Sequence, residues 1–405
     1  MFARLLTSWL ALSPASRLAI VAWVAVTAGV FGRVLASPPR SQTVVPIYLT
    51  AGQKWCESAD LYQYSPGLDL YRNPPGVAAA FAVLTPLPEK IAGLVWRGAC
   101  LAVFLLGLAR FRRDVIPELS PDRAAWLFTL AAPLALAPLN NGQVNLLLAG
   151  FALNGTTAAA RGRWWTAAGW FAPMGWIKVY PLAVGLLTAL TVPRQLGPRL
   201  LLLTAAGFVA PFALADPGYV LDQYRSLAHQ YGIDDRTHAD LTRVPLDWTV
   251  LPRTWLGWVP PKGLTAGVSL IAAVVAAGYV ARSLRDRTSG HGVTGPLVLG
   301  SVWMTVFGPA TEMNTYSVLA GIAAYLVVSP TPRPRWAVYA AMVGYGLLAA
   351  SVIRCAFPQD WRFQVLGPQA LGALLLAVAA LARPAKQGAA GWNPTARLSR
   401  TTSHV

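Results

Sequence analysis

The chain has 405 residues, of which 55% are hydrophobic and only 12% are charged, and its mean hydropathy is +0.47. A soluble domain usually carries about twice that charged fraction, so a string of ordinary soluble domains is excluded. The net charge of +17 could suit a nucleic-acid binder, but the basic residues lie in the gaps between apolar runs rather than in one cluster. That placement is typical of the loops of membrane proteins and argues against nucleic acid as a partner.

Apolar runs recur along the chain, and many are close to the length of a membrane span. At about 20 residues per span, the sequence predicts an all-α integral membrane protein, a polytopic bundle of about 10–13 transmembrane helices within residues 1–383. We expect spans at residues 18–34, 91–108, 124–139, 144–160, 200–214, 264–280, 295–307, 316–328, 337–352 and 365–381.

Four segments do not fit simple spans. Residues 37–75 and 216–262 are long and polar, and we expect them to form two outer loops. The apolar piece at residues 76–87 is flanked by prolines and is too short to span comfortably, so we expect a re-entrant or interfacial element. Residues 164–192 have basic residues on both flanks, which favours a hairpin of two short helices with Lys178 at its far turn.

Charge asymmetry sets the expected orientation of the bundle. If the spans alternate across the membrane, one face receives most of the arginines between spans, but only four of the 16 acidic residues: Asp114, Glu118, Asp122 and Asp286. Cytoplasmic loops are enriched in Lys and Arg, so we expect this face to be cytoplasmic, in a plasma (inner) membrane. Residues 384–405 would form a disordered, basic cytoplasmic tail. The opposite face takes both long loops.

The cysteines and histidines predict no metal centre. Cys56, Cys100 and Cys355 have no CxxC spacing, and we expect free thiols rather than a Cys56–Cys355 disulfide. The four His residues are scattered and form no HExxH pattern, so we predict no metal ion and no cofactor.

The outer face gathers the residues that could carry chemistry. Lys178 and Glu312 lie between apolar spans, where an ionisable group is costly and tends to mark function. The alternatives are that Lys178 snorkels to an interface and that Glu312 caps a helix. Asp234, Asp235 and Asp240 are more typical of solvated surface. The catalytic candidates are Asp60, Asp69 and Glu312, and the candidates for binding phosphate or sugar are Arg72, Asn141, Gln143, Asn145, Lys178, Tyr180 and Asn314.

This set of side chains suits sugar transfer from a lipid phosphate. A carboxylate can take the proton from an acceptor hydroxyl, while Lys and Arg neutralise a phosphate leaving group. Amides and aromatic faces can hold a sugar. The partners would be a polyprenyl-phosphate sugar donor, a glycolipid or glycan acceptor, and the surrounding membrane lipids.

Several short motifs, in this order, resemble those of glycosyltransferase family 87. They begin in the first outer loop and extend to about residue 330. The motifs are Tyr48-Leu49-Thr50-Ala51-Gly52, Asp60-Leu61-Tyr62, Tyr71-Arg72-Asn73-Pro74-Pro75, Asn141-Gly142-Gln143-Val144-Asn145, Ile177-Lys178-Val179-Tyr180-Pro181 and the region of Tyr316. The resemblance implies a GT-C membrane fold and a mannosyltransferase that uses polyprenyl-phosphate-mannose outside the cytoplasm.

The chain departs from the family pattern at the expected catalytic base. The family usually has an Asp four residues before the tyrosine of the first motif, and here that position is Val44. Asp60, Asp69 or Glu312 would then supply the base, Glu312 standing where the family has a His. Two other classes of function stay open: a lipid or small-solute transporter or flippase, and a catalytically inactive, lipid-binding relative.

Overall fold

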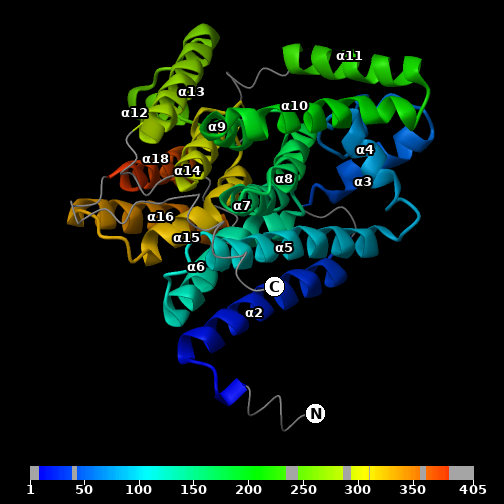
Figure 1. Cartoon of the computed structure of the whole chain (residues 1–405). Coiled ribbons are helices and arrows are strands. Elements are labelled where there is room, and N and C mark those ends of the chain that lie inside the picture. Colours follow the sequence, from blue (N-terminus) through cyan, green and yellow to red (C-terminus); the bar gives the residue numbers. More distant parts are fainter. Residues whose placement is uncertain are drawn as a thin grey trace, which may run out of the picture.

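A computed structural model describes residues 9–38, 43–233, 245–285, 293–309, 311–355 and 362–382, apart from the side chains of 284, 285, 353–355 and 362. The described residues form helices joined by short connections, without a β-strand. The all-α fold class predicted from composition is therefore confirmed. Figure 1 shows the bundle, with the long helices α2, α5 and α10 and the shorter α3 and α4.

The first half of the bundle runs from α2 to η2. Its helices are α2 (Pro14–Ala36), α3 (Val45–Cys56), α4 (Pro75–Ala82), α5 (Glu89–Asp114), α6 (Pro121–Asn141), α7 (Asn145–Ala160), α8 (Trp164–Ile177), η1 (Tyr180–Leu182), α9 (Ala183–Thr191), α10 (Pro193–Val209) and η2 (Ala210–Ala213).

The second half runs from α11 to α18. Its helices are α11 (Pro217–Ile233), α12 (Val250–Leu256), α13 (Lys262–Arg285), α14 (Thr294–Val302), the π-helix η3 (Trp303–Phe307), η4 (Met313–Leu319), α15 (Ala320–Val328), α16 (Arg335–Cys355), α17 (Arg362–Val365) and α18 (Pro368–Leu381).

Four helices are long and apolar enough to cross a membrane. They are Pro14–Ala36, Glu89–Asp114, Pro193–Ala213 and Lys262–Ser283. Shorter apolar helices stand at Tyr180–Thr191, Thr294–Phe307, Met313–Val328 and Pro368–Leu381. These lengths agree with a polytopic helical membrane protein. The total of 10–13 spans stays a prediction.

Both outer loops contain helices that the polar sequence did not predict. In the first loop, α3 buries Val45, Tyr48, Leu49 and Trp55, and it packs on α4. Gly52 permits that approach, since a Cβ there would lie 2.8 Å from the backbone nitrogen of Ala82. These loops are therefore packed parts of the fold rather than extended connections.

The apolar piece after the first loop forms α4, only eight residues long, which agrees with an element that does not span. The predicted hairpin at residues 164–192 is also confirmed. Helices α8 and α9 meet at Lys178, whose backbone is extended. Gly185 on α9 faces Phe171 on α8, with the virtual Cβ of Gly185 only 2.9 Å from that side chain. The chain therefore reverses at Lys178 and folds α9 back against α8.

The core is made of small and aliphatic residues from the central helices. Helix α7 is buried almost along its whole length and packs against α5 and α8. At Gly150 a Cβ would lie 2.8 Å from the backbone of Phe104 on α5, so the two helices approach closely at a glycine. This tight packing fixes the start of α7, at Asn145, one of the predicted site residues.

The structure describes the side chains of two of the three cysteines. Cys56 is exposed and Cys100 is buried, and both are free. The side chain of Cys355 lies outside the described residues. Free Cys56 agrees with the expectation that it does not pair with Cys355.

Candidate functional site

The turn between α6 and α7 is the centre of the candidate site. Helix α6 ends at a left-handed residue, Gly142, with φ of 71°. The Gln143 N–H donates to the carbonyl of Pro138, and the Gly142 N–H donates to the carbonyl of Leu139. This is the bonding expected where a glycine closes a helix. The closed turn directs Gln143 and Asn145 to the same region.

A chain of side-chain hydrogen bonds connects this turn to Glu312. The Asn145 amide Nδ2 donates to Gln143 Oε1 over 2.7 Å, and Gln143 Nε2 donates to Glu312 Oε2 over 3.1 Å. Gln143 and Asn145 are buried, while Glu312 is exposed. The structure therefore brings three predicted site residues together across 169 positions of sequence.

Glu312 has a second role at the start of η4. Its side chain accepts from the backbone N–H of Thr315, and its own N–H donates to the Thr315 hydroxyl over 3.3 Å, forming a capping box. The expectation that Glu312 caps a helix is therefore confirmed. Capping and contact with Gln143 coexist, and together they hold the carboxylate in one place.

Lys178 is a predicted cation that interacts electrostatically with this carboxylate. It lies at the extended residue after α8, and it interacts electrostatically with Tyr180, Tyr48 and Glu312. Its Nζ is 5.9 Å from the centroid of the Tyr180 ring. The Asn73 amide donates to the carbonyl of Ile177 over 3.0 Å, which ties the first outer loop to this break. Lys178 is thus positioned by two segments rather than by a mobile loop.

The first outer loop contributes Tyr48 to the same region. The Tyr48 side chain is buried on α3, its ring centroid is 4.8 Å from that of Phe81, and it interacts with both Lys178 and Glu312. Val44, which precedes α3, donates its N–H to the carbonyl of Asn141 over 3.0 Å. The position where the family resemblance expects an Asp therefore lies against the α6–α7 turn.

Asp60 and Asp69 are held elsewhere in the first loop. Asp60 is exposed and accepts from the Tyr62 N–H over 3.0 Å. Burial lowers the pKa of the Lys54 ammonium and the Asp60 carboxylate opposes that shift, so Asp60 lies near Lys54 on α3. Asp69 forms an ion pair of 2.9 Å with Arg72, and its side chain is 63% exposed. Neither carboxylate has a described contact with Gln143 or Lys178.

Arg72 lies in the first outer loop, where it meets α11. Its backbone carbonyl accepts from the Tyr231 hydroxyl over 2.9 Å, and Tyr231 interacts electrostatically with Lys178, Tyr180 and Arg72. Arg72 is therefore connected to the Lys178 region through Tyr231. A cation on each side of this tyrosine could neutralise a phosphate.

Asn141 and Asn314 are placed differently from Gln143. The backbone of Asn141 accepts from Val44 and Thr43, so its carbonyl has a structural role. Asn314 is buried on η4 and lines a separate small pocket with Ser317, Ser351 and Gln369. The acidic residues Asp234, Asp235 and Asp240 lie outside the described residues.

Sequence reasoning did not single out two groups that border this site. Gln230 on α11 is 6% exposed, and both atoms of its amide lack a hydrogen-bond partner in the described part of the chain. It precedes Tyr231. The buried positions of α11 are Val220, Gln223, Leu227 and Gln230, at helical spacing. That spacing in the sequence could have predicted that Gln230 lies on the buried face of a helix. A buried amide without a partner next to this region is a candidate for binding a ligand hydroxyl.

Arg97 is the other group that was missed. It is 2% exposed on α5 and donates to the carbonyls of Leu139, Asn140 and Gly93 and to the Thr43 hydroxyl. The guanidinium therefore satisfies the last carbonyls of α6 directly beside the Gly142 turn. Arg97 therefore stabilises the end of α6 that leads into the site.

The comparison with protein families agrees with this architecture. The family model of glycosyltransferase family 87 matches residues 71–309, which is more than half of the chain and includes Arg72, Gln143, Asn145 and Lys178. A comparison with curated proteins finds no match. Together with the polytopic helical fold, the family match shows that this chain is a membrane glycosyltransferase that belongs to glycosyltransferase family 87.

Proposed function

We propose that the protein transfers a hexose, with mannose as the first candidate, from a polyprenyl-phosphate donor to a glycolipid or glycan acceptor. The reaction would take place at the extracytoplasmic face of the plasma membrane. The observation that carries the proposal is the hydrogen-bonded chain Glu312–Gln143–Asn145, with Lys178 close enough to interact electrostatically with the same carboxylate. A base, amides and a cation within one region are the groups that such a transfer needs.

In the proposed reaction the acceptor hydroxyl attacks the anomeric carbon of the donor. The new carbon–oxygen bond forms as the bond from that carbon to the phosphate oxygen breaks, which inverts the anomeric centre. Glu312 takes the hydroxyl proton, and polyprenyl phosphate leaves with its electron pair. Lys178 and Arg72 would stabilise the phosphate charge, and Asn141, Gln143, Asn145 and Tyr180 would orient the sugar.

Glu312 is the strongest of the three carboxylates as the base. It contacts Gln143 and interacts with Lys178, whereas Asp60 accepts from its own loop and Asp69 is paired with Arg72. A general base must reach its proton directly or through one water. Asn314 is the weakest of the predicted sugar-binding residues, because it lines a different pocket.

The test is transfer by the purified full chain in liposomes that contain a polyprenyl-phosphate-hexose and a lipid-linked acceptor. We expect Glu312→Gln to lower kcat by about 10²- to 10⁴-fold, the usual contribution of a general base. The substituted amide keeps an oxygen that can cap η4, so the fold should survive. Asp60→Asn and Asp69→Asn are the matched controls and should stay within about threefold of the unchanged protein.

The same preparation separates the alternatives. Donor binding by the Glu312→Gln protein, measured with a fluorescent polyprenyl-phosphate-hexose, should persist while turnover is lost. A large loss in Asp60→Asn or Asp69→Asn with Glu312→Gln unaffected would assign the base to the first loop instead. Donor binding without transfer in the unchanged protein, with several donors and acceptors, would favour the inactive relative that Val44 suggests. Movement of the donor across the liposome without transfer would favour a flippase.

A further inference from the structure

A cavity lies at the other end of α14 and η3 from Glu312. It has a volume of about 80 Å³, is partly open, and lies where the ends of α13, α14, α15 and α18 meet. Helix α14 begins at this cavity, and α14 and η3 lead from it toward Glu312, so about 20 Å of helix separates the two sites.

A half-buried arginine whose guanidinium lacks its full set of partners lines this cavity. Among the described residues, the Nε and Nη1 atoms of Arg333 are buried and have no hydrogen-bond partner, while Nη2 donates to the carbonyl of Leu326. The described residues that line the cavity include no carboxylate. Two buried guanidinium nitrogens left in this state are costly, so they point to an anionic ligand.

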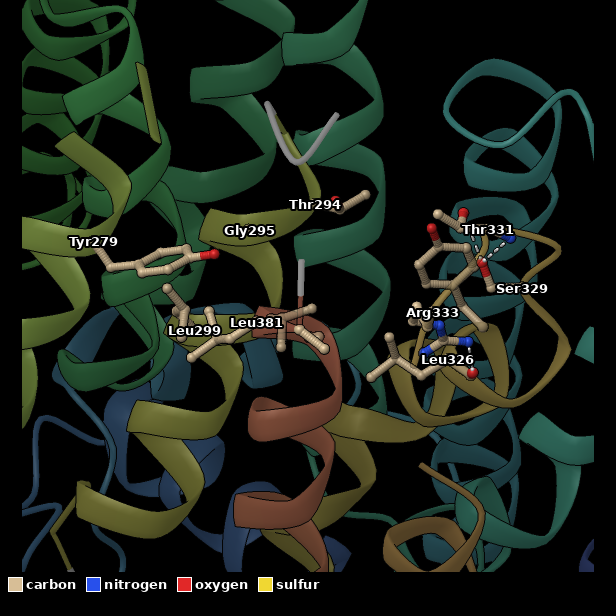
Figure 2. Close-up of a pocket in the computed structure, with 13 residues that line it drawn as sticks. Tyr279, Thr294, Gly295, Leu299, Leu326, Ser329, Thr331, Arg333 and Leu381 are labelled. Atoms are coloured by element: carbon tan, nitrogen blue, oxygen red, sulfur yellow. Dashed lines mark hydrogen bonds between the residues drawn. The ribbon is translucent and has the colours of Figure 1, made fainter. Parts of the chain in front are cut away.

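Polar groups stand around this guanidinium. Figure 2 shows Arg333 and Tyr279 on opposite sides of the cavity, with Thr294 on one edge and the hydroxyls of Ser329 and Thr331 near Arg333. Those two hydroxyls are joined by a hydrogen bond of 3.1 Å. Thr294 is the first residue of α14, whose preceding residue makes no side-chain cap. The free N–H groups of that helix end add positive potential to the cavity.

The rest of the cavity wall is apolar. Leu299, Leu326 and Leu381 line it together with Val298. One wall therefore suits a phosphate and the other suits a hydrocarbon chain. An acidic phospholipid has both parts, and anionic headgroups attract Arg and Lys at the cytoplasmic surface of membranes.

We propose that this partly open cavity binds the phosphate of an acidic phospholipid on Arg333, with the rest of the lipid outside the cavity. The site is independent of the glycosyl-transfer site, because it shares no residue with it and lies at the opposite helix ends. It predicts that the protein retains a specific lipid through purification.

Native mass spectrometry of the purified full chain in neutral detergent tests this proposal. Phosphatidylglycerol and phosphatidylcholine with the same acyl chains are added in turn. We expect one tightly bound phosphatidylglycerol, and we expect Arg333→Gln to weaken it by roughly tenfold or more, as for loss of a charge-assisted hydrogen bond. Arg335→Gln is the matched control, because Arg335 is exposed and lies two residues after Arg333. The affinity of this variant for phosphatidylglycerol should change by less than about twofold.

A second variant covers the case in which Arg333→Gln does not fold. Thr331 is exposed at the rim of the cavity, so Thr331→Trp should obstruct the lipid while leaving Arg333 in place. Equal binding of both lipids, or an equal loss in Arg335→Gln, would overturn the proposal. Displacement of the lipid by millimolar inorganic phosphate would also overturn it, since the site would then hold a soluble anion. Glycosyl transfer should be unchanged in Thr331→Trp.

Discussion

Lys178 places a positive charge near the proposed base and near the site of the phosphate leaving group. It interacts with Glu312 and Tyr48, and it stands at the only extended residue between the paired helices α8 and α9. A cation in this position can stabilise the charge that develops on a phosphate leaving group.

The prediction for Lys178 follows from this placement. Lys178→Gln should lower kcat/KM for the polyprenyl-phosphate-hexose by about 10²- to 10³-fold, as removal of a transition-state donor does. Lys54→Gln is the control, because Lys54 donates to the carbonyl of Gln63 and lies apart from Glu312. The measurement is steady-state transfer in liposomes over a range of donor concentrations. Comparable losses in the two variants would mean that Lys178 has no special part in the reaction.

Arg97 shows how a buried charge can serve a neighbouring turn. Arg97→Met would remove the side-chain donor to the Asn140 carbonyl and one of the two donors to the Leu139 carbonyl, and a buried acceptor left unpaired costs about 1–3 kcal/mol. We expect a melting temperature several degrees lower in detergent, with weaker transfer because the Gly142 turn loosens. Arg123→Gln, at an exposed position on α6, should leave the melting temperature unchanged. If the Arg97→Met protein keeps both its melting temperature and its transfer activity, Arg97 does not support the site.

At the scale of elements, the α6–α7 turn decides where Gln143 and Asn145 lie. Gly142 has a positive φ, and a Cβ there would lie 2.5 Å from Val45 Cγ2 and 3.1 Å from Arg97 Cζ. The turn therefore needs glycine for two reasons: its backbone conformation and the close approach of α3 and α5. Both reasons involve residues that are distant in sequence.

Gly142→Ala and Gly162→Ala separate those two reasons. Both positions have positive φ, so each substitution should cost about 1–2 kcal/mol of stability from the backbone alone. Only Gly142→Ala also meets its neighbours, since the Cβ at Gly162 would be 3.8 Å from Trp164. We expect transfer activity to fall by at least about tenfold in Gly142→Ala and to be retained in Gly162→Ala, measured beside the melting temperatures. Retained activity in Gly142→Ala would show that the turn tolerates displacement.

The sequence predicted the elements better than it predicted the site. Apolar runs gave most of the helices within a few residues, because membrane helices are recognised from composition alone. The helices α3 and α11 were missed because polar and aromatic residues obscured their period, although α3 buries Val45, Tyr48 and Trp55 at helical spacing. The contact of Gln143 with Glu312 could not be predicted, because it depends on how α7 packs beside η4.

At the scale of the whole molecule, the arginine-rich face is predicted to be cytoplasmic, and Cys56 offers a native probe of the opposite face. Cys56 is exposed at the end of α3, in the first outer loop, while Cys100 is buried and should not react. In a Cys355→Ser background, a membrane-impermeant maleimide should therefore label Cys56 in intact cells. With Cys56→Ser added, a cysteine introduced by Glu118→Cys, exposed among the arginines, should be labelled only after permeabilisation. The reverse labelling pattern would mean that the protein has the opposite orientation in the membrane. Glu312 and Lys178 would then lie on the cytoplasmic side, which would contradict the extracytoplasmic reaction.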